Sequence, residues 1–203
     1  MESSMPQYTN PTAFARLGHV DKAVDWSREA VREAREENIV VSADYKQIIL
    51  TNTFFVRPQH PQATLHIGGY WENKDIYGPY NIEGAQANEE LYVDDSAMFL
   101  RLNLPEDHAP VHRVSYSYRL RSEKPLTAYS ITSLMSWTLR LYTCRLCFEG
   151  NLPSTVTWTL TSTPKDGLGT EKEVLTRELE AAGNCFSFTR NTVEQGESVV
   201  LWK

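Results

Sequence analysis

The stretch VHRVSYSYRLR, residues 111–121, indicates the fold class more clearly than any other part of this chain. Apolar and polar residues alternate along it, as they do in a β-strand with one buried face and one face in water. We therefore predict a half-buried strand with basic residues on its outer face. The inward set is Val114, Tyr116, Tyr118 and Leu120, and the outward basic set is Arg113, Arg119 and Arg121.

Other stretches have the β-branched and aromatic composition of strands. In residues 97–104, four apolar side chains share one face, and residues 154–162 alternate threonines with larger apolar residues. An antiparallel pairing of 97–104 with 111–121 is plausible across the turn between them. We expect Tyr116, Trp158 and Leu201 to meet in one core. Further strands are predicted at 39–57, 63–67, 143–149, 185–189 and 198–202, with a long loop region over 58–96.

Three segments predict helices. Residues 21–37, DKAVDWSREAVREAREE, are rich in Ala, Arg and Glu and have a thin apolar stripe. Residues 130–141 have apolar residues at helical spacing, although a strand competes there. Residues 170–173, TEKE, form a capping box before an apolar run that ends at Gly183.

The expected fold is therefore a mainly β or α+β protein, an antiparallel β-sandwich-like domain with an N-terminal helix and two further short helices. We divide the chain into a flexible arm over 1–16, the helix region over 17–38, and a single β-rich domain over 39–203.

Composition narrows the function classes. The chain has 203 residues, a formal net charge of −6 and three cysteines. The net charge argues against coating of nucleic acid, so no sequence-specific nucleic-acid binding is expected. An odd thiol count, no apolar N-terminal leader and no long apolar run predict an intracellular protein without a transmembrane segment.

Catalytic and metal-binding signatures are absent from the sequence. It has no HExxH, GxSxG or phosphate-binding loop motif. Cys144 and Cys147 form a CxxC, but in a strand these two side chains point to opposite faces, which excludes a redox pair or zinc knuckle. We therefore predict no enzyme activity, no catalytic residues, no metal and no cofactor, and cysteines that serve as buried structural thiols.

Three groups of residues remain as candidate binding sites. A basic face could contact an anionic partner; an aromatic loop over 69–92 could hold a ligand; and the N-terminal helix could mediate self-association. For each group, ordinary packing or solvation is the competing interpretation. The basic face is Arg101, Arg113, Arg119, Arg121 and Lys124; the loop is Tyr70, Trp71, Tyr77 and Tyr80; the self-association set is Val24, Trp26 and Val31.

Residues 113–142 resemble a segment of rhabdovirus matrix proteins, in which a basic strand leads through a Lys-Pro or Arg-Pro turn and a Tyr to a helix with a Trp. The matching features here are Arg119 to Arg121, Lys124-Pro125, Tyr129 and Trp137. Residues 98–103 and 117–121 also resemble a strand pair of bornavirus matrix protein, whose fold differs.

The resemblance implies a non-enzymatic structural assembly protein, matrix-like or capsid-like, in the host cytoplasm or virion. It would form homo-oligomers and contact a nucleocapsid or an anionic membrane surface. The alternative is a β-sandwich module that binds a glycan or a peptide through its aromatic loops.

Overall fold

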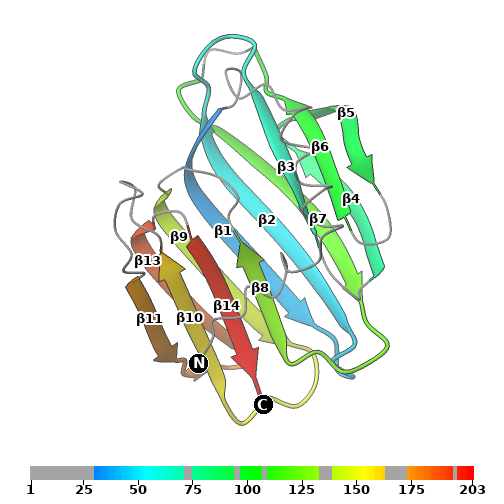
Figure 1. The fold of residues 1–203 in the computed structure, drawn as a ribbon, viewed down its shortest axis with the longest axis vertical. Helices are drawn as coiled ribbons and strands as arrows, with labels where there is room; N and C mark the ends of the chain where they lie inside the picture. Colours follow the sequence, from blue (N-terminus) through cyan, green and yellow to red (C-terminus); the bar gives the residue numbers. More distant parts are fainter. Residues whose placement is uncertain are drawn as a thin grey trace.

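In the part of the chain that the structure describes, the strands are joined by turns and loops and no helix is present. The computed structural model describes residues 30–70, 75–93, 97–106, 109–132, 139–162, 173–193 and 196–203. Within these ranges, fourteen strands form three sheets (Figure 1).

The largest sheet has seven strands in the order β12-β13-β9-β1-β2-β7-β4. Its central strand β1 runs antiparallel to β2 and parallel to β9. The strands are β1 (Val31–Val41), β2 (Gln47–Arg57), β4 (Asp75–Glu83), β7 (His112–Arg121), β9 (Leu139–Phe148), β12 (Ala181–Ala182) and β13 (Cys185–Val193).

A four-stranded antiparallel sheet covers part of the large one, and Figure 1 shows it in front of β9 and β1. Aromatic contacts join the two layers. The ring of Trp158 stacks on that of Phe188 with centroids 3.9 Å apart, and Phe148 meets Trp202 edge-on at 5.7 Å. The strands, in sheet order, are β11 (Glu173–Glu178), β10 (Val156–Ser162), β14 (Gly196–Trp202) and β8 (Ala128–Thr132).

The third sheet has three antiparallel strands in the order β3 (Thr64–Tyr70), β6 (Ala97–Asn103) and β5 (Gln86–Val93). Two contacts attach its edge strand β3 to the start of β1. The backbone N–H of Ala30 donates to the carbonyl of Thr64 at 2.8 Å, and the Arg32 guanidinium donates to the carbonyl of His66. Leu65 and Leu102 of this sheet belong to the same hydrophobic core as the other two sheets.

The predicted inward set of residues 111–121 is confirmed, but the opposite face is not open to water throughout, since Ser115 and Ser117 are also buried. In β7, Val114, Tyr116, Tyr118 and Leu120 are each at most 3% exposed. In β14, by contrast, the inward side chains are Val200 and Trp202, and Leu201 is 45% exposed. The expectation that Leu201 lies in the core was wrong by one residue of register, because neighbouring strand residues face opposite ways.

The predicted helices are wrong wherever the structure describes the chain. Residues 31–37 belong to β1, residues 128–132 and 139–141 to β8 and β9, and residues 173–178 to β11. Residues 1–29, which include the predicted arm, lie outside the described residues. Helix propensities differ by only about 0.7 kcal/mol among ordinary residues, and sheet pairing on both sides of β1 outweighs such preferences.

The predicted loop region is also corrected. Most of residues 58–96 forms β3, β4 and β5. In the described residues, no helix is long and apolar enough to span a membrane.

Candidate functional site

The predicted basic face does not form a continuous cationic surface. Arg113 and Arg121 are exposed on the outer face of β7, with Arg119 partly buried between them. On the same face, Ser115 and Ser117 are buried and contact threonine hydroxyls of β2. Two buried serines therefore separate Arg113 from Arg119 and Arg121 along this face.

The members of the basic set have neighbours of their own. Arg113 forms a long ion pair with Glu83 at 3.7 Å, and the Nε of Arg121 donates to Gln47 at 3.3 Å. Arg101 lies in the three-stranded sheet, where its Nε lies 3.3 Å from His66 Nε2. Lys124 is exposed beyond the end of β7. Their role in binding an anion stays a prediction.

The other two predicted groups are only partly described. Tyr70 ends β3, and Tyr77 and Tyr80 belong to β4, opposite Arg119 and Ser117 of β7. The aromatic loop is therefore largely strand. Trp71, Val24 and Trp26 lie outside the described residues, and Val31 is the first residue of β1.

A buried polar cluster, which the sequence did not reveal, joins the large sheet to the four-stranded one. The Glu37 carboxylate pairs with Arg35 at 2.5 Å and accepts a hydrogen bond from the Tyr142 hydroxyl at 2.7 Å. That hydroxyl lies 3.3 Å from Ser198 Oγ, which accepts from the indole N–H of Trp158 at 3.0 Å. These contacts tie β1, β9, β10 and β14 together.

Burial controls the electrostatics of this cluster. Desolvation raises the pKa of Glu37, while Arg35 and the Tyr142 hydrogen bond oppose that rise. Desolvation also raises the pKa of Tyr142 well above its usual value, and the charge of Glu37 adds to this. Because Glu37 is only 1% exposed, the cluster serves as an internal connection between sheets.

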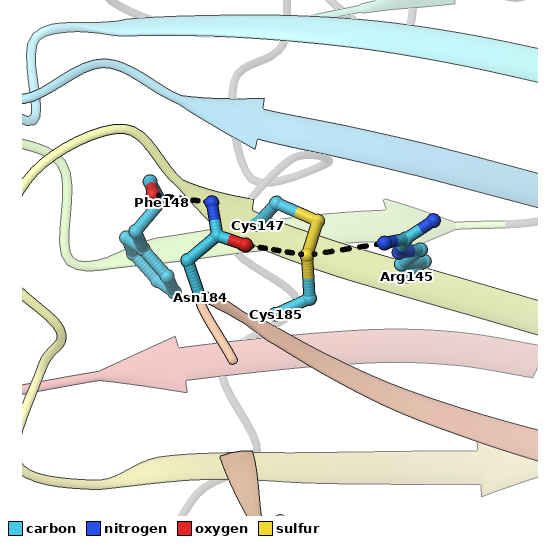
Figure 2. Close-up of a disulfide and its surroundings, with 5 residues drawn as sticks. All are labelled: Arg145, Cys147, Phe148, Asn184 and Cys185. Carbon is cyan, nitrogen blue, oxygen red and sulfur yellow. Dashed lines mark hydrogen bonds between the residues drawn. A yellow bond between two sulfur atoms is a disulfide. The ribbon is translucent and has the colours of Figure 1, made fainter. Parts of the chain in front are cut away.

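Two of the three cysteines differ from the prediction of buried structural thiols. Cys147 and Cys185 form a disulfide between β9 and β13, where the two residues are register partners (Figure 2). Cys144 is free and buried, and burial raises its pKa well above the usual value. The prediction that Cys144 and Cys147 point to opposite faces agrees with this arrangement. The described residues contain no group of three or more metal-ligating side chains.

The edge of β11 offers a different binding geometry, formed by backbone groups. No described strand pairs with its free side. Leu179, just after the strand, donates its N–H to the carbonyl of Val156 on β10 at 2.9 Å. Since backbone groups alternate in direction along a strand, the N–H and C=O groups of Val174, Thr176 and Glu178 point away from β10.

The side chains of this edge are accessible too. Val174 is 59% exposed, the highest value among the large apolar residues that the structure describes. Thr176 is exposed, and its hydroxyl lies 3.2 Å from that of Thr159. Val174 and Thr176 thus border the outer face of the four-stranded sheet, which Glu178 shares as an exposed charged residue. Other outward side chains on this face are Thr157, Thr159, Thr161, Val199 and Leu201.

The other sheet edges are less suited to pairing with an added strand. The β3 edge carries the Ala30 and Arg32 contacts, and β4 and β5 have irregular registers. The strand β12 has two residues, and β8 has five, with Tyr129 buried. The six residues of β11 keep one regular register with β10. Proteins usually protect such edges with bulges, Pro or covering segments.

The β11 edge was missed because the capping box and apolar run of residues 170–183 were interpreted as a helix. The β-branched pair Val174 and Thr176 was the available signal for a strand. The Arg35–Glu37 cluster was missed because residues 21–37 were also interpreted as a helix. Its charged side chains gave no sign of burial.

Comparisons with known proteins give structural similarities only. No protein-family model matches the chain, and no curated protein matches it. A yeast LTA4 hydrolase in complex with bestatin has a TM-score of 0.48 and 13% identity, over 87% of this chain and 29% of that one. A putative protease from Parabacteroides distasonis has a TM-score of 0.48 and 7% identity, over 85% and 40%.

A third similar structure is the E323A mutant of an M1 zinc metallopeptidase from Deinococcus radiodurans, bound to a Tyr-Ser-Ala substrate. Its TM-score is 0.46 and its identity 13%, over 86% of this chain and 43% of that one. The chain therefore spans less than half the length of these proteins. At TM-scores below 0.5, the similarity assigns no activity and no functional residue to this chain.

These comparisons correct the expected identity. The resemblance to viral matrix proteins is wrong, since the similar structures are hydrolases and peptidases and no family model supports a matrix protein. The expected virion role and the expected absence of enzyme activity are withdrawn with it, since the similar structures are named as hydrolases and peptidases and, at these TM-scores, assign no activity to this chain.

Proposed function

We propose that this chain binds polypeptide segments in extended conformation, by adding them as a strand to the free edge of β11. The observation that carries the proposal is the outward direction of the backbone groups of Val174, Thr176 and Glu178 on a regular strand. Only another polypeptide presents N–H and C=O groups at the matching two-residue spacing. Main-chain hydrogen bonds then supply affinity, and alternate side chains supply specificity.

The side chains around the edge favour a particular kind of peptide. A bound strand would place every second side chain on the outer face, beside Val174, Thr176 and Glu178, and aliphatic or β-branched residues fit beside the first two. The other side chains would lie on the opposite face, next to Leu175 and the exposed Arg177. An acidic residue beside Arg177 would complete the match. The preferred ligand is therefore an alternating aliphatic segment with one acidic residue.

Proline substitution provides a sharp test. Thr176→Pro removes an N–H that points away from β10, so the pairing of β10 with β11 keeps its hydrogen bonds. Leu175→Pro removes an N–H that points toward β10 and serves as the destabilised comparison. A synthetic eight-residue peptide of alternating Val and Thr with one central Asp is the probe. Its analogue with N-methyl groups on successive residues, which blocks both edges of the peptide strand, is the control ligand.

We expect the probe to bind the wild-type protein and to shift the backbone NMR signals of Val174, Thr176 and Glu178. Thr176→Pro should weaken binding about tenfold or more, the loss of roughly 1.4 kcal/mol, at an unchanged melting temperature. If the N-methylated peptide binds as well as the probe, strand addition is excluded. Equal binding by Thr176→Pro and wild type would exclude the β11 edge.

A second copy of the chain could occupy the same edge, so we keep homo-oligomerisation as a proposal. Sedimentation of the wild type and of Thr176→Pro at matched concentrations tests it. The intracellular location also stays a prediction. It no longer has the support of the cysteine count, because Cys147 and Cys185 form a disulfide.

A further inference from the structure

The disulfide lies on the outer face of the large sheet, and its two sulfurs have different surroundings. Cys147 is partly exposed, whereas Cys185 is 7% exposed. The Arg145 guanidinium, two residues before Cys147 on the same face of β9, donates to the Sγ of Cys185 at 3.5 Å. Figure 2 shows Arg145 and Asn184 on opposite sides of this sulfur.

This arrangement makes the Sγ of Cys185 the better leaving group in thiol–disulfide exchange. Thiol–disulfide exchange is faster when the leaving sulfur is stabilised as a thiolate, and a neighbouring Arg stabilises a thiolate. The Oδ1 of Asn184 lies 3.4 Å from the same sulfur and would accept the S–H after protonation. The Asn184 side chain is itself held by donating to the Phe148 carbonyl at 3.1 Å.

We propose that the Cys147–Cys185 disulfide is a site of reversible S-thiolation by small thiols such as glutathione. The thiolate of the small thiol attacks the Sγ of Cys147, the more exposed residue of the pair, and a new S–S bond forms there. The Cys147–Cys185 bond breaks, and its electron pair leaves on Cys185 Sγ beside Arg145. The small thiol is oxidised to the disulfide level and Cys185 is reduced. Return of the Cys185 thiolate to Cys147 expels the small thiol and restores the disulfide.

The third cysteine does not compete in this exchange. Cys144 lies on the opposite, inner face of β9 and is 1% exposed. Its side chain faces the core with Tyr142, away from the sulfurs of the disulfide. The adduct is therefore expected at one residue only.

The experiment incubates the folded protein with reduced glutathione, followed by acid quenching, alkylation of free thiols and peptide mapping by mass spectrometry. We expect glutathione on Cys147 and the alkyl label on Cys185. Arg145→Gln should slow adduct formation about tenfold, and Arg145→Lys should retain part of the rate. Arg140→Gln on the same strand is the matched control, since Arg140 pairs with Glu33 and should leave the rate unchanged.

Three results would overturn the proposal: an adduct on Cys185, equal rates for wild type and Arg145→Gln, or an adduct that forms only in urea-unfolded protein. Should Arg145→Gln fail to fold, the mapping of the wild-type adduct still decides which sulfur is attacked. Raised ionic strength should then slow the wild-type reaction, because it screens the Arg145 charge.

Discussion

The Tyr142 hydroxyl donates to the carboxylate of Glu37 at 2.7 Å between two parallel strands, inside the space that the sheets enclose. Glu37 thereby has two partners, Arg35 and Tyr142, at a position cut off from water. A charge in such a place is tolerated only while its partners remain.

The first prediction concerns removal of one partner. Glu37→Leu should lower the free energy of unfolding by about 3–5 kcal/mol, because it leaves the Arg35 guanidinium without its carboxylate. The double variant Arg35→Met with Glu37→Leu should recover most of this loss. Urea denaturation measures both. Glu36→Gln, on the other face of β1, is the control and should change stability by about 0.5 kcal/mol or less. If the double variant is no more stable than Glu37→Leu, the loss of stability in Glu37→Leu comes from altered packing and not from the unpaired charge of Arg35.

The second prediction tests the side-chain alternation in β14. Val200 is 2% exposed and its neighbour Leu201 is 45% exposed. Val200→Ala should therefore destabilise the protein by about 2 kcal/mol through lost apolar burial and a small cavity. Leu201→Ala should cost about 0.5 kcal/mol or less. Chemical denaturation of the two variants compares them directly, and the reverse order would mean that β14 is shifted by one residue.

The third prediction concerns alkaline pH. Burial raises the pKa of Tyr116 from 10.0 to about 12, despite the opposing charges of Arg35 and Arg32. Because the pKa is raised in the folded protein, the contribution of the neutral Tyr116 hydroxyl to the free energy of unfolding is fully present below pH 10. It is lost as the pH rises through 12. When the pH is raised from 9 to 11, the free energy of unfolding should fall in the wild type. The fall should be about 1.4 kcal/mol smaller in Tyr116→Phe. Urea titrations at these two pH values measure the difference; an identical loss in both proteins would contradict the burial of this hydroxyl.

The fourth prediction concerns the disulfide's contribution to stability. The bond closes a loop with a sequence separation of 38, which contains β10 and β11. Its removal in the double variant Cys147→Ser with Cys185→Ser should cost about 2–4 kcal/mol, since the unfolded chain regains the freedom of that loop. Thermal unfolding of the wild type with and without a dithiol reductant gives an independent measure. The reduced wild type and the double variant should then have similar melting temperatures.

The sequence by itself determined the elements in which every local signal agrees. In β7, β-branched and aromatic residues occupy the inward positions and polar residues the outward ones, so propensity and pattern both favour a strand. The same holds for β10, whose Trp158 is buried as expected. The CxxC gave the right geometry for Cys144 and Cys147, because side-chain alternation within one strand is a local property.

Only the tertiary structure decided the rest. Residues 31–37 contain good helix formers, yet β1 lies between β2 and β9, and hydrogen bonding to both neighbours outweighs a preference of a few tenths of a kcal/mol per residue. The β11 segment became a strand in the same way, through pairing with β10. The disulfide partner of Cys147 could not be read from the sequence, because β13 brings Cys185 opposite to it only after the sheet has formed. These contacts join residues far apart in the chain, and no local pattern encodes them.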